Sequence, residues 1–139
     1  MTVYLESSAV LAWLLGQRGG ADVRSRVDRA DRVVTSVLTM TEVRRTLVRA
    51  ERMGELPAAQ GQRLRGLLAR AARAWIQMEA SSEVRARAEE SFPVEPVRTL
   101  DALHLATAVL FTRAYPDLTV LTFDPRVAAN AEALGLGGG

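Results

Sequence analysis

Residues 3–9, VYLESSA, place an acid directly after a short apolar run and directly before a helical pattern. The same order recurs near the other end of the chain in residues 118–125, LTVLTFDP. If both runs are parallel strands, Glu6 and Asp124 stand at the carboxyl ends of one sheet, where open α/β sheets bind their ligands. The two stretches therefore predict both the fold class and the position of a site.

Strand-like and helix-like segments alternate along the whole chain. Short runs rich in apolar and β-branched residues predict strands, and apolar residues at helical spacing predict helices. Such alternation favours an α/β fold with a central parallel β-sheet flanked by helices on both faces. At 139 residues the chain suits one domain, expected over residues 1–136, followed by a flexible glycine tail at 137–139. The expected strands are 2–5, 32–36, 75–79 and 118–122, and the expected helices are about 8–15, 21–29, 39–53, 57–75, 82–91, 100–113 and 125–134.

The composition excludes several classes of function. The chain has no Cys, so it carries neither a disulfide framework nor a thiolate metal site. Its longest stretches free of charged residues, 7–17 and 102–112, are too short to cross a bilayer. No basic segment precedes an apolar one at the start, so no signal peptide is expected. Together these features predict a cytoplasmic protein that does not act at a membrane.

Arginine supplies all 18 basic residues, and the net charge is only +2. Because so small a net charge gives little non-specific affinity for phosphate, the arginine usage is better explained by a GC-rich coding sequence than by nucleic-acid binding. A local cluster is still possible. Arg45, Arg49 and Arg52 share one predicted helical face, and Arg44 lies beside them.

Four acids stand at predicted helix starts: Glu6, Glu42, Asp101 and Asp124. The N-terminus of a helix favours negative charge, so each acid alone has a purely structural explanation. Asp124 precedes a proline and has the form of an ordinary cap. Glu42 lies three residues after Thr39 and would close a capping box.

Considered together, the same acids favour a metal site. Glu6 and Asp101 lie among apolar neighbours, where an unpaired charge is costly. Arg98 could neutralise one of them, but a metal ion would serve several carboxylates at once. Oxygen ligands without Cys and with little His favour Mg²⁺ or Mn²⁺ over Zn²⁺. Such ions can activate water and stabilise the leaving oxygen in phosphodiester cleavage.

Several polar residues lie next to these acids in the sequence. Ser7 and Ser8 are candidate helix caps first and neighbours of a ligand second. Thr122 would point to the same side of a strand as a site acid and could hydrogen-bond a carboxylate or a metal-bound water. His104 shares a helical face with one of the acids, but its apolar neighbours favour a partly buried, hydrogen-bonded histidine over a catalytic or ligand role.

Four motifs in this order give the chain a resemblance to a known family. It resembles the PIN-domain ribonucleases, and specifically the VapC-type toxins of bacterial toxin–antitoxin pairs, from Val3 to about Leu136. The third motif is the most specific of the four, and the second alone is weak. The motifs are YLESSA at 4–9, TE at 41–42, RTLDALHLA at 98–106 and LTFDPR at 121–126.

The resemblance implies a PIN-like fold and an endoribonuclease that hydrolyses RNA phosphodiester bonds with metal-activated water. It implies Mg²⁺ or Mn²⁺ as cofactor and a homodimer. It also implies a cognate antitoxin that blocks the acidic site, with operator DNA contacted only through the antitoxin. The residues it implies are Glu6, Glu42, Asp101 and Asp124 as the catalytic metal site. Beside the resemblance, we expect Ser7 and Thr122 to support these acids and Arg44, Arg45, Arg98 or Arg126 to hold the RNA backbone.

The chain departs from the family at one position. Glu6 stands where the family usually has Asp, and the extra methylene moves the carboxylate outward by roughly 1 Å, a shift to which catalysis can be sensitive. Three explanations stay open: a natural variant that repositions the metal, a degenerate toxin with weak activity, or a mutation introduced to allow expression.

The main prediction is therefore a toxin endoribonuclease whose activity Glu6 could reduce. The alternative is a catalytically weakened PIN-fold binding module that acts mainly in a complex with antitoxin and operator DNA. A nuclease for DNA flaps ranks last, because so short a chain lacks the extra helical regions that grip duplexes.

Overall fold

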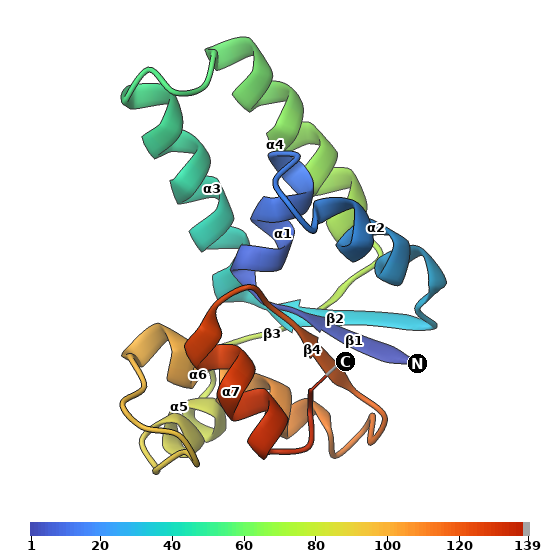
Figure 1. The fold of residues 1–139 in the computed structure, drawn as a ribbon, viewed down its shortest axis with the longest axis vertical. Helices are drawn as coiled ribbons and strands as arrows, with labels where there is room; N and C mark the ends of the chain where they lie inside the picture. The colour runs from blue at the N-terminus through green and yellow to red at the C-terminus, as the bar shows by residue number, and fades with distance from the viewer. Residues whose placement is uncertain (138–139) are drawn as a thin grey trace.

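The fold is built on a parallel four-stranded sheet with strand order β3-β2-β1-β4 (Figure 1). The computed structural model describes residues 1–137. The predicted α/β architecture with a central parallel sheet is confirmed, and each predicted strand overlaps an observed one. The strands are β1 (Thr2–Leu5), β2 (Arg32–Ser36), β3 (Ile76–Met78) and β4 (Thr119–Leu121).

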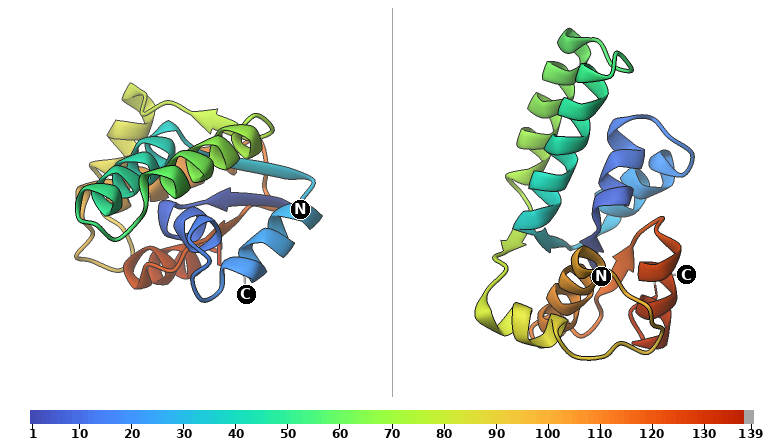
Figure 2. Two further views of the ribbon diagram at one scale, coloured as in Figure 1. Left: turned by 90° about the horizontal axis from the view of Figure 1, so that it is seen from above. Right: turned by 90° about the vertical axis from the view of Figure 1, so that its left-hand side faces the viewer.

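Helices cover both faces of this sheet (Figures 1 and 2). The first four helices lie on one face, and the α3–α4 hairpin projects away from the sheet. The last three helices lie on the other face. The helices are α1 (Ser7–Leu14), α2 (Gly20–Arg29), α3 (Val37–Arg52), α4 (Ala58–Ala72), α5 (Ser82–Ala88), α6 (Thr99–Phe111) and α7 (Pro125–Ala133).

Strand β1 is buried on both faces, as a central strand of a parallel sheet must be. Its side chains alternate between the two layers. Val3 and Leu5 pack into the apolar cluster formed with α1, α2, α3 and α4. Tyr4 packs into the opposite cluster, with Leu105 of α6. The alternation therefore places the tyrosine beneath α6, on the far side of the sheet from α1.

The strand order reverses at β1, which pairs with β2 on one side and with β4 on the other. Such a switch point opens a crevice at the carboxyl ends of the strands. Glu6 follows β1 there, and its backbone N–H donates to the Leu121 carbonyl of β4 at 3.1 Å. Asp124 follows β4 at the same edge. The sheet topology thus brings together two acids that lie at opposite ends of the sequence.

The start of α3 differs from the prediction. Its N-cap is Ser36, whose hydroxyl accepts a hydrogen bond from Leu38 N at 3.1 Å. Thr39 is buried inside the helix and accepts a hydrogen bond from the Thr35 hydroxyl at 2.7 Å. The predicted capping box between Thr39 and Glu42 is therefore wrong, because β2 runs into the helix without a loop and the serine reaches the free N–H groups first.

Within residues 1–137, no helix is long and apolar enough to cross a membrane. Of the predicted tail, Gly137 forms an isolated parallel bridge with Val120. Residues 138 and 139 lie outside the described residues, so the flexibility predicted there stays a prediction.

Candidate functional site

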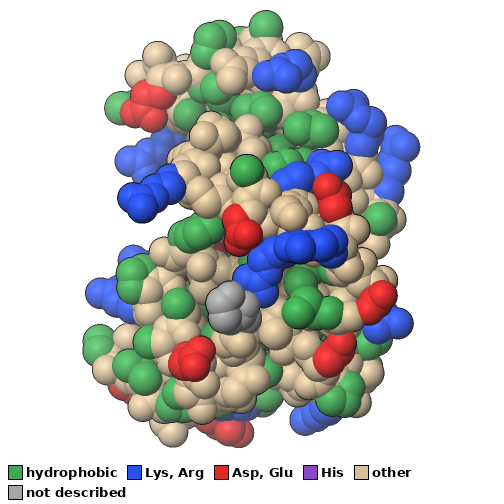
Figure 3. Space-filling view, turned by 45° about the vertical axis from the view of Figure 1, so that its right-hand side comes forward, with side chains coloured by type: hydrophobic (Ala, Val, Ile, Leu, Met, Phe, Trp, Pro, Cys, Tyr) green, Lys and Arg blue, Asp and Glu red, His purple; other side chains and the backbone are tan. Residues whose placement is uncertain are grey.

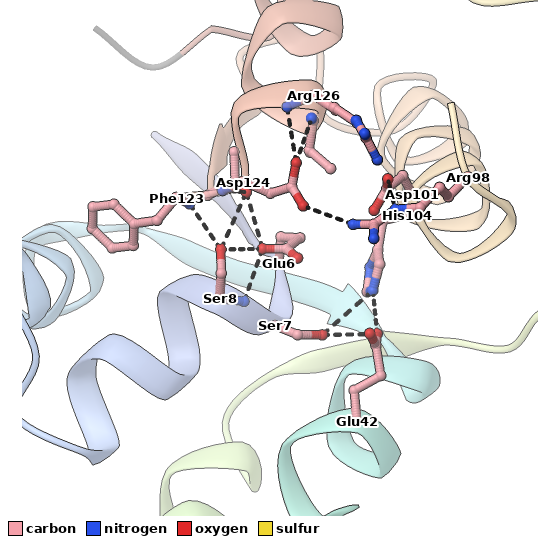
Figure 4. Close-up of polar contacts among 12 residues, drawn as sticks. Glu6, Ser7, Ser8, Glu42, Arg98, Asp101, His104, Phe123, Asp124 and Arg126 are labelled. Atoms are coloured by element: carbon pink, nitrogen blue, oxygen red, sulfur yellow. Dashed lines mark hydrogen bonds and ion pairs between the residues drawn. The ribbon is translucent and has the colours of Figure 1, made fainter. Parts of the chain in front are cut away.

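The four candidate acids lie around the carboxyl edge of the sheet, each supplied by a different element (Figure 4). Glu6 caps α1, Glu42 lies in α3, Asp101 lies in the first turn of α6 and Asp124 caps α7. Their hydrogen bonds connect Glu6, Asp124 and Asp101 in one network and place Glu42 in another. Within the described part of the chain, no three acidic or histidine side chains lie close enough together to hold a metal ion. The predicted joint metal site therefore stays a prediction.

Glu6 is held by hydroxyl groups. The residue is 6% exposed, and its Oε2 accepts from Ser8 N at 2.8 Å, from Ser8 Oγ at 2.5 Å and from Thr122 Oγ1 at 2.9 Å. These bonds compensate the cost of burying a carboxylate. The cap of α1 is thus Glu6 itself, and the prediction that Ser7 or Ser8 caps this helix is wrong. Thr122 hydrogen-bonds a carboxylate, as predicted.

Thr122 also connects Glu6 to the next acid of the site. Its hydroxyl accepts from the backbone N–H of Asp124 at 3.0 Å while it donates to Glu6. Asp124 Oδ1 in turn accepts from Arg126 N at 2.8 Å and from Val127 N at 3.3 Å, which confirms the predicted cap of α7. The backbone therefore fixes one oxygen of Asp124 and leaves Oδ2 for other partners.

A single guanidinium joins Asp124 to Asp101. Arg98 Nη2 lies 3.4 Å from Asp124 Oδ2, and Arg98 Nε lies 3.3 Å from Asp101 Oδ2. Asp101 is 6% exposed, so it needs a cationic partner, whereas the arginine side chain is 67% exposed. The two aspartates thus favour a positive charge between them. The group that supplies this charge, the Arg98 guanidinium, belongs to an exposed side chain.

Glu42 belongs to a separate network that reaches through the protein to β1. Its Oε1 lies 2.5 Å from His104 Nε2 and accepts from the Ser7 hydroxyl at 2.8 Å. On the other side of the ring, His104 Nδ1 lies 2.8 Å from the Tyr4 hydroxyl. His104 is hydrogen-bonded, as predicted, but at 2% exposure it is fully buried and not partly buried.

The partners of that histidine were not predicted. Neither the link from His104 to Glu42 nor the contribution of Tyr4 has a local signal in the sequence. Only the motif position of Tyr4, two residues before Glu6 in the same strand, could have drawn attention to it.

The surroundings of Glu42 favour its ionised form. Burial raises the pKa of Glu42, but the hydrogen bond from His104, together with the Ser7 hydroxyl, outweighs burial and holds the pKa below its usual value. Tyr4 behaves oppositely. Burial, followed by the nearby charges of Glu6 and Glu42, raises the pKa of Tyr4 well above its usual value. The tyrosine therefore stays a protonated phenol near neutral pH.

The donor set suits a hard divalent cation. All four acids offer carboxylate oxygens, which Mg²⁺ and Mn²⁺ prefer. The shared Arg98 shows that positive charge is favourable between Asp101 and Asp124. The side chains of Asp124 and Glu42 are 21% and 27% exposed, so both acids are reached by solvent. The chemistry of these side chains therefore suits such an ion, although within the described residues no three of them lie close enough together to hold it.

The four arginines predicted to hold RNA come from three parts of the chain: α3, the residue before α6, and the first turn of α7. Arg44 and Arg45 are exposed on α3, and Arg126 is exposed in the first turn of α7. Arg98 is engaged by the two aspartates. On the face shown in Figure 3, basic side chains are interspersed with acidic ones and do not merge into one basic surface. The role of these arginines in RNA binding stays a prediction.

Comparison with known proteins identifies the family. A family model described as PIN domain matches residues 3–133. The chain therefore belongs to the PIN-domain family. It is 34% identical over 134 residues to Ribonuclease VapC35 of Mycobacterium tuberculosis, in both strain CDC 1551 / Oshkosh and strain H37Rv, and the match covers 96% of this chain and 83% of the relative. The predicted resemblance to VapC-type PIN-domain ribonucleases is confirmed.

Solved structures share the same fold. The Mycobacterium tuberculosis toxin VapC20, described as cleaving the sarcin–ricin loop, matches with a TM-score of 0.64 at 14% identity, over 91% of this chain and 93% of that chain. PAE2754 from Pyrobaculum aerophilum matches with a TM-score of 0.63 at 18% identity, over 94% and 84% of the two chains. At these identities the likeness concerns the fold alone.

Proposed function

We propose that this protein is a metal-dependent endoribonuclease that acts as the toxin of a type II toxin–antitoxin system. Membership of the PIN-domain family and the likeness to a VapC ribonuclease support a nuclease. The observation that carries the proposal is the cation shared by Asp101 and Asp124 at the switch point of the sheet. An arrangement of acids that already attracts one cation suits a divalent ion.

Asp101 and Asp124 would hold that ion, with Glu6 and Glu42 as further ligands or as ligands through water. The bound cation, Mg²⁺ or Mn²⁺, would supply an activated water and neutralise charge on the departing oxygen of the RNA phosphodiester. Arg98 would leave its position between the aspartates, and its 67% exposure gives it the freedom to do so.

The remaining residues of the site orient these acids. The Ser8 and Thr122 hydroxyls restrain Glu6, and the first N–H groups of α7 restrain Asp124. Glu42, whose pKa is held below its usual value, would stay ionised and would act as a ligand or orient the water. Arg98, once released, would face the RNA backbone, where a guanidinium can bind a phosphate with two hydrogen bonds. Arg44, Arg45 and Arg126 would contact the RNA further away.

The same proposal defines the partners. A cognate antitoxin would cover the acidic site, operator DNA would be contacted only through that antitoxin, and the toxin would act as a homodimer in the cytoplasm. The alternative, a PIN-fold binding module with little catalysis, predicts the same antitoxin and operator complex without RNA cleavage.

The deciding experiment incubates the purified protein with structured RNA in Mn²⁺ or in excess EDTA. We expect cleavage only with metal, more of it for Glu6→Asp and none for Asp101→Ala. Circular dichroism melts of all three proteins would verify that they are folded. Equal cleavage by the three proteins would contradict the assignment, and no cleavage by any of them, with antitoxin binding intact, would favour the binding module.

A further inference from the structure

A buried hydrogen-bonded chain runs from the centre of the sheet to one acid of the site. It passes from the Tyr4 hydroxyl to His104 Nδ1 at 2.8 Å, and from His104 Nε2 to Glu42 Oε1 at 2.5 Å. Tyr4 is 0% and His104 is 2% exposed, so solvent does not interrupt the chain. The two rings also meet edge to face, with centroids 6.1 Å apart. Three elements that are distant in sequence, β1, α6 and α3, are connected in this way.

The direction of each hydrogen bond follows from the end groups. An ionised carboxylate can only accept, so the proton shared with Glu42 belongs to His104 Nε2. When Nε2 carries the only ring proton, the other nitrogen, Nδ1, is an acceptor, and the Tyr4 hydroxyl 2.8 Å away can donate to it. The tyrosine thereby selects the tautomer of the histidine that presents an N–H to the acid. The Ser7 hydroxyl supplies a second donor to the same Glu42 oxygen.

A purely structural role would not require this arrangement. An apolar pair of similar size would fill the same space without the cost of burying polar groups. The chain ends on a carboxylate that is only partly buried and reaches the site edge. His104 also lies one helical turn after Asp101 in α6. The helix that carries one site acid therefore fixes the position of another acid from the opposite layer.

We propose that His104 is a positioning residue for Glu42 and that Tyr4 selects the histidine tautomer that this task requires. The catalytic consequence rests on the proposed nuclease function, whereas the hydrogen-bonded chain itself does not. The two can therefore be tested separately.

The first test uses the fact that the chain contains a single histidine. In nitrogen-labelled protein, the ring resonances of an NMR spectrum then belong to His104 without further assignment. We expect the Nε2–H tautomer with Nδ1 unprotonated, a partial loss of that preference in Tyr4→Phe, and no change in Tyr115→Phe, which removes the other tyrosine hydroxyl of the chain. A wild-type Nδ1–H tautomer would overturn the proposal whatever the activity.

The second test measures cleavage kinetics and Mn²⁺ affinity. Removal of a group that orients a metal ligand typically costs about 10- to 100-fold in activity or metal affinity. We expect His104→Leu to lower kcat by about that factor with KM little changed, and Tyr4→Phe to lower kcat less. His104→Gln, whose amide can still donate to Glu42, should recover part of the loss, and Tyr115→Phe should behave as wild type.

The outcomes separate the two proposals. If folded His104→Leu and Tyr4→Phe proteins keep wild-type kcat and Mn²⁺ affinity, the positioning role is wrong. If the wild type shows the expected tautomer but cleaves no RNA in any metal, the nuclease proposal fails while the hydrogen-bonded chain is supported. Should His104→Leu fail to fold, Tyr4→Phe decides, because it removes one oxygen and keeps the ring.

Discussion

Asp101 and Asp124 share one counterion, the Arg98 guanidinium, although they begin different helices and come from separate motifs. The positive charge of the guanidinium offsets the electrostatic repulsion between the two carboxylates. It also means that any second cation must compete with the arginine. If the site binds a divalent ion as proposed, its affinity would depend partly on how readily Arg98 leaves.

Replacement of Arg98 by Ala should tighten Mn²⁺ binding. Because the guanidinium side of these ion pairs is 67% exposed, they contribute on the order of 0–1 kcal/mol, so we expect about a two- to fivefold lower dissociation constant by isothermal titration calorimetry. Helix α6 should keep its start, because the Arg98 side chain makes no capping hydrogen bond. Arg113→Ala, which breaks a surface ion pair with Glu83, is the matched control and should change nothing. Weaker Mn²⁺ binding in Arg98→Ala would contradict competition between the two cations.

Asp124→Asn should separate the stability of the protein from its activity. Asparagine caps a helix about as well as aspartate, so the α7 cap is kept and the melting temperature should change little. The charge that would bind the metal is lost, and cleavage should fall by about 100-fold or more. Asp124→Ala, measured in parallel, should also lose the cap and about 1 kcal/mol of stability. An active Asp124→Asn protein would show that this acid serves only the helix.

Thr122→Val should weaken the restraint on Glu6. It removes the donor to Glu6 Oε2 and the acceptor for Asp124 N while it keeps the shape of the side chain. Asp124 N loses its acceptor, while Glu6 keeps its two Ser8 donors. Because an unpaired polar group costs about 1–3 kcal/mol, we expect a lower melting temperature, together with roughly tenfold slower cleavage. Thr122→Ser keeps the hydroxyl and is the control. Cleavage by Thr122→Val at the rate of Thr122→Ser would show that this restraint is catalytically irrelevant.

The α3–α4 hairpin should lose a stabilising interaction in acid. Arg65 Nη1 lies 2.7 Å from Glu51 Oε1, and this hydrogen bond, with the arginine charge, lowers the pKa of Glu51 below its usual value of 4.5. An interaction that lowers a carboxyl pKa stabilises the folded protein at pH values above the usual pKa of the group. This stabilisation is lost as the pH falls through the lowered pKa. Glu51→Gln should therefore reduce the melting temperature near neutral pH and have a smaller effect near pH 3.

Arg65→Met tests whether that effect belongs to the pair. It removes the other partner, so its pH dependence should parallel that of Glu51→Gln. A penalty for either variant that grows on acidification would have the wrong sign for this ion pair.

Much of the fold was predictable because its signals are local. The strand in residues 2–5 and the helix that follows it are recognisable from short apolar runs and from spacing. The parallel pairing then places Glu6 and Asp124 at one edge, since the carboxyl ends of parallel strands must meet there. The cap at Asp124 was predictable for the same reason, because its proline follows at once.

The internal organisation of the site was not predictable, because it depends on side chains that meet across layers. Glu42 had a satisfactory local explanation as half of a capping box, yet it bonds a histidine on another helix. The sequence did not determine which acid Arg98 would neutralise. Its two partners follow from the places where α6 and α7 begin. Sequence spacing specifies which residues share a face of one helix, but not which faces meet.

The hydrogen bond between Glu42 and His104 bridges the two helical layers at the open edge of the sheet. Each layer has its own apolar core, and neither core depends on that bond. A small outward tilt of one layer would move Glu42 away from Asp101 while both cores stay packed. Such a local opening needs far less free energy than global unfolding. On heating, cleavage should therefore decline before the helical circular dichroism signal does, because the contact between α3 and α6 opens before either core unfolds.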